Sequence, residues 1–254
     1  MLLRVTDIHK GYAKSKGFFG KTITPVLKGV SLEVDYGECV GLIGESGSGK
    51  STLGKIILGV EKPDAGTVVF GGNEGKKELS VVFQDYTSSA NPRLRVKHVL
   101  SEPLKERAKK QRAYLGHLLR EVGLDESFLE RFPHQLSGGQ LQRVCIARAL
   151  ATKPKFILLD EAVSSLDVSV QLQILKLLKL LKEKYRLSYL FITHDLMSVT
   201  YLCDRVIFFK EGNIVETVSH VSALHGVKDP YSRSLLNAVK AMEIPDMCRA
   251  KVCQ

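Results

Sequence analysis

The sequence predicts an α/β fold with a largely parallel sheet. Short apolar, strand-like runs alternate with helix-like segments along most of the chain, which is typical of parallel sheets. A glycine-rich turn directly joins one buried run, 40–43, to an expected helix at 52–58. With 44% hydrophobic and 25% charged residues, the composition is globular and excludes disordered and collagen-like chains. The 254 residues suit one large domain, or one domain with a small lobe.

The expected elements follow from periodicity and from turn residues. Alternating apolar and polar residues predict strands at 2–8 and 26–42, and Tyr36-Gly37 forms a turn inside the second segment. The turn at 63–66, with its proline and glycine, precedes a strand at 67–70, and another strand is expected at 79–83. Further apolar runs and helical patterns predict strands at 156–159, 188–193, 206–209 and 214–218, and helices at 139–151, 169–184, 196–203 and 232–240.

Residues 86–135 differ in character from the rest of the chain. They are charged, contain no strand-like runs, show helical periodicity from 97 to 122, and are punctuated by Pro92, Pro103 and Pro133. We interpret this block as an inserted helical lobe.

Neither a membrane span nor a secretory signal is visible. The apolar runs 156–159 and 189–192 fall far short of the ~20 residues that a spanning helix needs. The first residues run straight into Arg4 and Asp7 without an apolar region. We therefore expect a cytosolic protein.

The five cysteines suggest no disulfide framework, because their number is odd and their positions are scattered. Cys248 and Cys253 form a C-x4-C pair, but two ligands do not complete a zinc site. Ordinary reduced thiols are the simpler interpretation, and an iron–sulfur or other metal role stays open.

The basic balance of the chain is ambiguous by itself. There are 37 Lys and Arg against 27 Asp and Glu, a formal net charge of +10, which would suit nucleic acid, anionic lipid or an acidic partner. Two clusters interleave with apolar residues, as on solvated faces of amphipathic helices: Lys105, Arg107, Lys109, Lys110 and Arg112, and then Lys176, Lys179, Lys182, Lys184 and Arg186.

A phosphate-binding loop is the clearest motif. The pattern G-x-x-x-x-G-K-[ST] is matched in full by Gly44, Glu45, Ser46, Gly47, Ser48, Gly49, Lys50 and Ser51, and Thr52 completes the expected set. Glycines allow successive N–H groups to turn toward phosphate oxygens, and the helix start adds positive charge. Lys50 is expected to neutralise β- and γ-phosphate oxygens, and Ser51 to ligate Mg²⁺.

Two adjacent acids end a buried strand in the second half of the chain. Residues 156–159 are apolar and lead into Asp160 and Glu161. Next to a complete phosphate loop, Asp160 is expected to hold Mg²⁺, and Glu161 to act as general base toward the attacking water. A helix-capping pair is the structural alternative.

A third segment carries a family resemblance. The string 136–140, Leu-Ser-Gly-Gly-Gln, followed by Leu-Gln-Arg and a helix, resembles the signature of ATP-binding-cassette (ABC) ATPases. The resemblance implies that Ser137, Gly138, Gly139 and Gln140 meet the γ-phosphate of ATP bound to another subunit. It implies a cassette over 1–254, with a mostly parallel core sheet, an antiparallel β subdomain, a helical subdomain at about 86–150 and a family tail at about 219–254.

Other residues follow in the order typical of that family. Gln84 resembles the glutamine that contacts Mg²⁺ and senses the γ-phosphate, and Asp167 resembles the acid of the loop that follows the catalytic strand. His194 resembles the switch histidine that positions Glu161 and water. Tyr12 matches the aromatic residue that stacks on adenine, with a turn tyrosine as the alternative.

Finer features resemble the oligopeptide, dipeptide and nickel importer subfamily. They are the insertion at 12–25, the sequence Asn-Pro-Arg at 91–93 and the tail 229–236. The segment 160–164, Asp-Glu-Ala-Val-Ser, departs from the more usual Asp-Glu-Pro-Thr, as in nickel-import ATPases. The implied function is ATP-driven uptake of nickel, in chelated form, with di- or oligopeptide as the alternative cargo.

The resemblance also implies partners and location. We expect a second cassette, two permease subunits and an extracytoplasmic solute-binding protein, with this chain peripheral on the cytoplasmic side of the membrane. ATP and Mg²⁺ are the expected ligands. Two other classes are the alternatives: an ABC ATPase acting on nucleic acid, a class that usually carries paired cassettes, coiled coils or zinc modules, and a degenerate cassette that only binds nucleotide.

Overall fold

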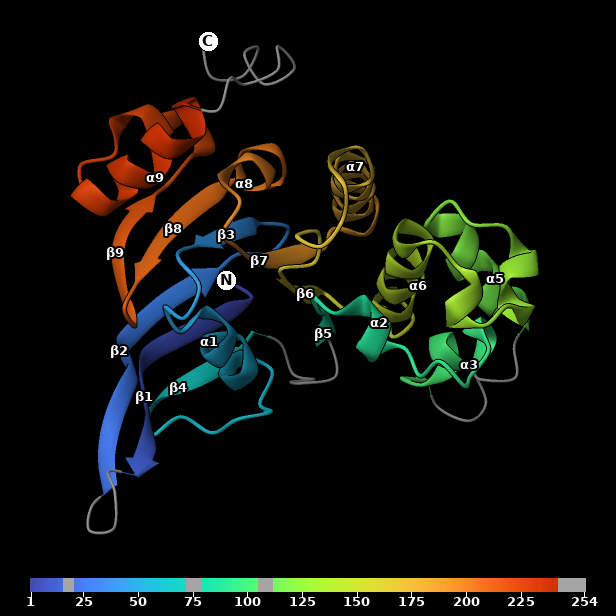
Figure 1. Ribbon diagram of the computed structural model, residues 1–254, viewed down its shortest axis with the longest axis horizontal. Coiled ribbons are helices and arrows are strands. Elements are labelled where there is room, and N and C mark those ends of the chain that lie inside the picture. The colour runs from blue at the N-terminus through green and yellow to red at the C-terminus, as the bar shows by residue number, and fades with distance from the viewer. Residues whose placement is uncertain (16–20, 72–78, 105–111, 242–254) are drawn as a thin grey trace. The chain divides into compact units, whose positions relative to one another are not determined.

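The computed structural model describes residues 1–15, 21–71, 79–104 and 112–241 (Figure 1). The chain divides into two compact units, the first combining Met1–Asn73 with Ser188–Gln254 and the second spanning Glu74–Leu187. Some residues singled out in the sequence lie outside the described ranges: Cys248, Cys253, and Lys105, Arg107, Lys109 and Lys110 of the first basic cluster.

The first unit contains an antiparallel sheet of order β2-β1-β4, formed by β1 (Leu3–Ser15), β2 (Lys21–Val34) and β4 (Ala65–Phe70). The strand expected at 2–8 continues to Ser15, because β2 pairs with it along its whole length, with Tyr12 opposite Thr24. This pairing satisfies backbone groups that the sequence pattern alone does not place. Within the insertion noted at 12–25, the described residues 12–15 and 21–25 therefore extend a β-ribbon.

The same unit contains strands in the order β7-β3-β8-β9. The central strand β3 (Cys39–Ile43) runs parallel to β7 (Ser188–Thr193) and to β8 (Arg205–Lys210), while β9 (Asn213–Val218) is antiparallel to β8. Every residue of β3 and β7 is buried. Near-continuous burial of this kind is what parallel strands covered on both faces show.

The described part of the first unit contains three α-helices. They are α1 (Lys50–Ile57), α8 (Leu196–Leu202) and α9 (Pro230–Ala241), and a 3₁₀ turn at Val221–Gly226 precedes the last of them. Helix α1 follows β3 after the glycine-rich turn, and α8 follows β7, so that each predicted strand-to-helix connection is confirmed within one or two residues.

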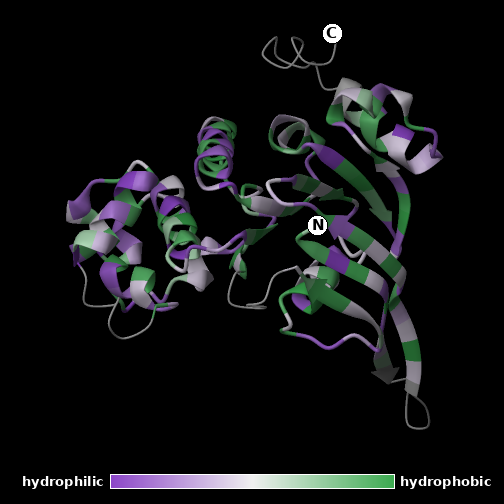
Figure 2. Cartoon of the chain, turned by 180° about the vertical axis from the view of Figure 1, so that it is seen from behind, coloured by the Kyte–Doolittle hydropathy of each residue, from purple (hydrophilic) through white to green (hydrophobic). Residues whose placement is uncertain are grey.

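The second unit pairs β5 (Leu79–Val82) with β6 (Phe156–Asp160) in parallel. Helix α6 (Gly138–Leu150) precedes β6, and α7 (Val168–Tyr185) follows it. Figure 2 shows that α7 is amphipathic, since it buries Ile174, Leu175, Leu178 and their apolar neighbours while Lys176 is exposed. The predicted α/β class, with mostly parallel strands and a separate antiparallel sheet, is confirmed.

The block after β5 is helical where it is described. It contains α2 (Tyr86–Ser89), α3 (Val96–Ser101), α5 (Arg112–Glu121) and short 3₁₀ turns at Glu126–Glu130 and Pro133–Gln135. Three cations from this block surround the carboxylate of Glu130 at 2.8 Å each: Lys97, Arg112 and Arg95. Their hydrogen bonds lower the pKa of Glu130 to about 2.

Among the described residues, the helices lack the combination of length and apolar character that crossing a lipid bilayer requires.

Candidate nucleotide-binding site

The phosphate-binding loop connects β3 to α1 in the first unit. Two of its glycines are required by packing or backbone conformation, since a Cβ on Gly44 would overlap the carbonyl oxygen of Phe209, and Gly49 has φ +108° at the helix N-cap. By contrast, a Cβ on Gly47 would meet open space. The loop is thus packed on β8 at one end and open at its outer turn, where a ligand can approach.

Lys50 opens helix α1 and points back into the loop. Its Nζ donates to the carbonyl oxygens of Gly44 and Glu45, at 2.7 Å each, and lies 3.4 Å from Ser48 Oγ. The residue is only 5% exposed. The hydrogen bonds compensate the burial of the ammonium group, so that the charge is held at the centre of the loop. Ser51, by comparison, is exposed in the first helical turn.

Two contacts support the loop from the C-terminal part of the chain. The Gly212 N–H, in the turn between β8 and β9, donates to the Ser48 carbonyl at 2.9 Å. The Glu45 N–H donates to Tyr231 Oη, also at 2.9 Å. Tyr231 belongs to the tail segment 229–236, and the sequence pattern gives no signal for its contact with the phosphate loop.

Tyr12, the predicted adenine-stacking residue, lies on β1 and is 40% exposed. Its hydroxyl donates to Glu61 Oε1 at 2.6 Å and also hydrogen-bonds Thr52, the last residue of the predicted phosphate-binding set. The bond to Glu61, followed by burial, raises the pKa of Tyr12. Its ring is therefore held beside the start of α1, with Lys10 Nζ 5.7 Å from the ring centroid.

His194 follows β7 and is exposed. The last residue of β7, Thr193, is paired with Ile43, the last residue of β3, so that His194 and Gly44 leave neighbouring parallel strands at the same edge. Asp195 then caps α8 by accepting the N–H groups of Met197 and Ser198. The first unit therefore brings together the phosphate loop, Tyr12 and the predicted switch histidine.

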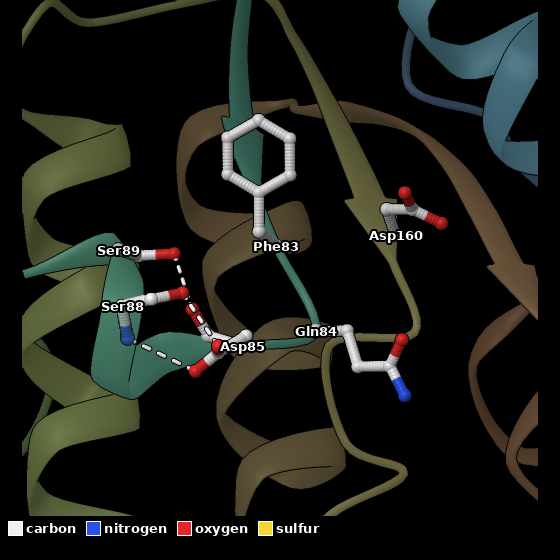
Figure 3. Close-up of a pocket in the computed structure, with 6 residues that line it drawn as sticks. All are labelled: Phe83, Gln84, Asp85, Ser88, Ser89 and Asp160. Carbon is white, nitrogen blue, oxygen red and sulfur yellow. Dashed lines mark hydrogen bonds between the residues drawn. The ribbon is translucent and has the colours of Figure 1, made fainter.

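In the second unit, Gln84 and Asp160 also lie where two neighbouring parallel strands end. Val82 of β5 is paired with Leu159 of β6, so that Gln84 and Asp160 follow neighbouring parallel strands at one edge. They share a pocket of about 450 Å³, drawn in Figure 3 and lined by Phe83, Gln84, Asp85, Ser88, Ser89 and Asp160. Carboxylate and amide oxygens at such an edge form a donor set that suits Mg²⁺.

The wall of this pocket is held by Asp85. Its carboxylate caps α2, accepting the N–H groups of Thr87 at 3.0 Å and Ser88 at 2.9 Å as well as both hydroxyl groups. These bonds, the Ser88 hydroxyl first, lower the pKa of Asp85 far below its usual range. The residue after Gln84 is consequently rigid and ionised.

Glu161, the predicted general base, has a left-handed backbone with φ +47°, which is costly for a residue with a side chain. Two contacts hold the chain around it. Ser164 Oγ donates to the Glu161 carbonyl at 3.0 Å, and Gln142 Nε2, fully buried on α6, donates to the Ala162 carbonyl at 2.6 Å. The sequence pattern gives no signal for the contact between Gln142 and Ala162, because it joins residues on different elements.

The signature segment begins helix α6. Ser137 is its N-cap: its hydroxyl accepts the Gln140 N–H at 3.4 Å, and Gln140 Oε1 accepts the Ser137 N–H at 3.0 Å. A Cβ on Gly138 would lie 2.7 Å from Tyr86 Oη, and one on Gly139 would lie 2.6 Å from Val170 Cγ1. Close packing thus requires both glycines and leaves an exposed serine at a positive helix end.

Asp167 occupies the equivalent position on α7. Its carboxylate accepts the Val170 N–H at 3.0 Å and the Ser169 hydroxyl at 2.7 Å, and these bonds, the hydroxyl first, lower its pKa. The second unit thus holds Gln84 and Asp160 in one pocket. Glu161 directly follows Asp160 in the chain, and Ser137 and Asp167 cap the starts of α6 and α7.

Comparison with known proteins agrees with this geometry. The family model described as "ABC transporter" matches residues 27–164. A metal-staphylopine import system ATP-binding protein, CntF, of Staphylococcus aureus is 46% identical over 92% of this chain and 98% of its own. A nickel import ATP-binding protein, NikE, of Shigella dysenteriae is 42% identical over 94% of each chain, and a probable D,D-dipeptide transport ATP-binding protein, DdpF, of Escherichia coli is 39% identical over 96% of this chain and 80% of its own.

A solved structure gives the same result. The dimeric post-hydrolysis state of the ATP-binding cassette MJ0796, bound to ADP and Pi, superposes with a TM-score of 0.72 at 30% identity, over 86% of this chain and 98% of that one. The loop at Lys50, the acids that end β6 and the start of α6 all lie within the residues, 27–164, that the family model matches. The chain belongs to the family of ABC transporter ATP-binding proteins.

Proposed function

We propose that this chain is the ATP-hydrolysing subunit of an ABC importer. The observation that carries the proposal is the phosphate loop, in which a buried Lys50 lies at the centre of a glycine turn that opens α1. Residues suited to the remaining steps lie at the ends of parallel strands, with His194 after β7 and Asp160 and Glu161 at the end of β6. The three curated relatives, all named as ATP-binding proteins of import or transport systems, support it.

The chain's residues divide the work of hydrolysis. Tyr12 stacks on the adenine ring, and the loop N–H groups with Lys50 hold the phosphates. Ser51, Gln84 and Asp160 would hold Mg²⁺, and their all-oxygen donor set fits that ion. When bound, Mg²⁺ would neutralise charge on the β- and γ-phosphate oxygens. Glu161 accepts a proton from the attacking water, and His194 hydrogen-bonds the γ-phosphate and orients that water.

We propose that this chain, as a single cassette of residues 1–254, acts together with a second, different cassette. Ser137 and the N–H groups of α6 would face the γ-phosphate held by the partner's loop, with Asp167 alongside. The exposed, capped start of α6 supports this role, and so does the dimeric form of the related cassette bound to ADP and Pi.

The cargo that we propose is nickel, in chelated form. One relative is named for nickel import and another for metal-staphylopine import, which supports a chelated metal, while the D,D-dipeptide relative supports the peptide alternative. Permease subunits would bind at the pocket of Gln84 and Asp85 on the cytoplasmic side of the membrane, and an extracytoplasmic protein would deliver the cargo.

The catalytic part is tested by Glu161→Gln. This change removes the proton acceptor and keeps the shape, so ATP turnover should fall about 10²–10⁴-fold while Mg·ATP binding persists. Glu183→Gln, on the exposed face of α7, is the matched control and should leave both unchanged. Near-normal turnover of the Glu161→Gln protein would overturn the role of general base.

The cargo is tested separately, by deleting this subunit in cells and measuring uptake of radioactive nickel and of a labelled dipeptide. Loss of nickel uptake with dipeptide uptake unaffected is the expected result. Unchanged nickel uptake with lost dipeptide uptake would refute the nickel assignment and leave the ATPase assignment intact.

A further inference from the structure

The tail residue Tyr231 touches the phosphate loop directly. It lies in the first turn of α9, 186 residues from Glu45, and its hydroxyl oxygen accepts the Glu45 N–H at 2.9 Å. This N–H belongs to the peptide group whose carbonyl is that of Gly44. The Gly44 carbonyl is one of the two that accept Lys50 Nζ at 2.7 Å. One peptide plane therefore lies between the loop's ammonium group and the tail's phenol.

This arrangement joins two hydrogen bonds in series. A donor bound to a carbonyl polarises the peptide and strengthens the bond that its N–H makes, and the effect is larger away from bulk water. Lys50 is buried, so bulk water screens the interaction of its ammonium group with the Gly44 carbonyl only weakly. The orientation of the peptide between Gly44 and Glu45 is consequently held from both sides.

Tyr231 is itself fixed in place. Asp229 Oδ1 accepts the Tyr231 N–H at 2.8 Å, and Lys210 Nζ lies 5.1 Å from the centre of the tyrosine ring. Lys210 ends β8, the strand whose Phe209 carbonyl lies under Gly44. The phenol thus stands between the start of α9 and the strand that supports the loop.

The start of α9 is anchored in turn on β9. Glu216 accepts the backbone N–H of Lys228 at 2.7 Å and that of Asp229 at 3.2 Å, and Arg233 Nε donates to the Val227 carbonyl at 3.1 Å. Bonds of this kind to an ionised carboxylate are stronger than neutral ones. The start of α9 is therefore held to β9 and to the segment that precedes the helix.

We propose that Tyr231 is a positioning residue for nucleotide binding, which connects the C-terminal helix to the phosphate loop. Its role rests on the proposed function of the loop. When ATP binds, Lys50 must exchange the Gly44 carbonyl for phosphate oxygens. The peptide then loses one of its two supports, and the hydroxyl of Tyr231 keeps it from rotating, so that the loop N–H groups remain aimed at the phosphates.

The decisive comparison is between Tyr231→Phe and Tyr36→Phe in the full chain. The first removes the acceptor of the Glu45 N–H and keeps the ring. The control removes a hydroxyl in the same unit, in the turn between β2 and β3, that donates to the Gly71 carbonyl directly after β4 at 3.2 Å. Calorimetric titration with Mg·ATP should show a dissociation constant about two- to tenfold higher for Tyr231→Phe, the worth of one hydrogen bond, and no change for the control.

Two further readouts separate positioning from a loss of fold. Hydrogen exchange at the Glu45 amide should accelerate in Tyr231→Phe, while both variants melt at similar temperatures. In the assembled transporter, the KM for ATP should rise in parallel with the dissociation constant, and kcat should stay within about twofold, because the groups that carry out hydrolysis are untouched.

The result that would overturn the proposal is an unchanged dissociation constant in Tyr231→Phe, or an equal rise in Tyr36→Phe. A rise that appears only together with a lowered melting temperature would also contradict it. If the unaltered chain failed to bind Mg·ATP, the proposed function would fail instead, and amide exchange at Glu45 would still show whether the tyrosine contact exists.

Discussion

A buried glutamine on the signature helix offers a test of how the catalytic strand is held. Gln142 is fully buried, and its Nε2 donates to the Ala162 carbonyl at 2.6 Å. Its other amide atom, Oε1, has no hydrogen-bond partner among the described residues. Ala162 directly follows Glu161, whose φ of +47° is strained. The substitution Gln142→Leu keeps the volume and removes both polar atoms.

The effect on stability should be small because the contributions oppose one another. Losing the hydrogen bond leaves the Ala162 carbonyl buried and unpaired, which costs about 1–3 kcal/mol. Removing the unpaired Oε1 recovers about 1–3 kcal/mol by the same reasoning, and a leucine gains from burial. The free energy of unfolding should therefore change by no more than about 1.5 kcal/mol.

The effect on turnover should be larger. A strained backbone persists only where its surroundings determine it, and the bond from Gln142 is one of the contacts that hold the segment after Glu161. Once this bond is lost, the segment can relax and displace the carboxylate. Displacement by about 1 Å costs up to roughly a hundredfold in rate, so kcat should fall about ten- to hundredfold while the KM for ATP changes little.

The assay combines urea unfolding with steady-state ATP hydrolysis in the assembled complex. Gln173→Leu, at an exposed position on α7, serves as the control and should change neither quantity strongly. If Gln142→Leu hydrolyses ATP at the normal rate with a normal unfolding curve, the Ala162 contact does not hold the catalytic segment. If Gln142→Leu unfolds at a much lower urea concentration, the loss of the hydrogen bond to Ala162 outweighs the removal of the unpaired Oε1, and the expected small change in stability is wrong.

Two further predictions concern packing and pH. Gly44→Ala should place a methyl group against the Phe209 carbonyl and destabilise the protein by about 1–3 kcal/mol in urea unfolding; a neutral effect would show that the loop can move off β8. Because the pKa of Glu130 is lowered from 4.5 to about 2, its stabilising effect should be complete above pH 4.5 and lost as the pH falls toward 2. Urea midpoints of the unaltered protein and Glu130→Gln should therefore converge over that range, and a gap that widens on acidification would refute the ion cluster.

The sequence predicts the strands, turns and helix starts that carry the candidate site residues, because these elements depend on residues that are close together in the chain. The apolar run of β3, the glycines after it and Lys50 define a strand, a turn and a helix start without reference to distant residues. The same holds for β6 with Asp160, and for the capped serine that begins α6. These elements lie within one or two residues of their predicted positions.

Non-local pairing was the part that sequence could not supply. The strand expected at 2–8 extends to Ser15 only because β2 is there to pair with it, and residues 12–15 show no clear alternation of their own. Likewise, the Sγ atoms of Cys39 and Cys203 lie 3.4 Å apart across 164 positions, and Tyr231 reaches Glu45 across 186. No periodicity records such contacts, because they depend on how the strands and α9 pack together.

The inward position of Lys50 affects which anions the loop can accept. Its ammonium group is already a ligand of the protein's own carbonyl oxygens at Gly44 and Glu45. An incoming anion must replace these hydrogen bonds before it can bind the ammonium group of Lys50. Inorganic phosphate offers few contacts in exchange, whereas a nucleoside triphosphate brings a base and three phosphoryl groups. These carbonyl contacts shield the lysine from small anions, and we expect the loop to discriminate against those that are abundant in any cell.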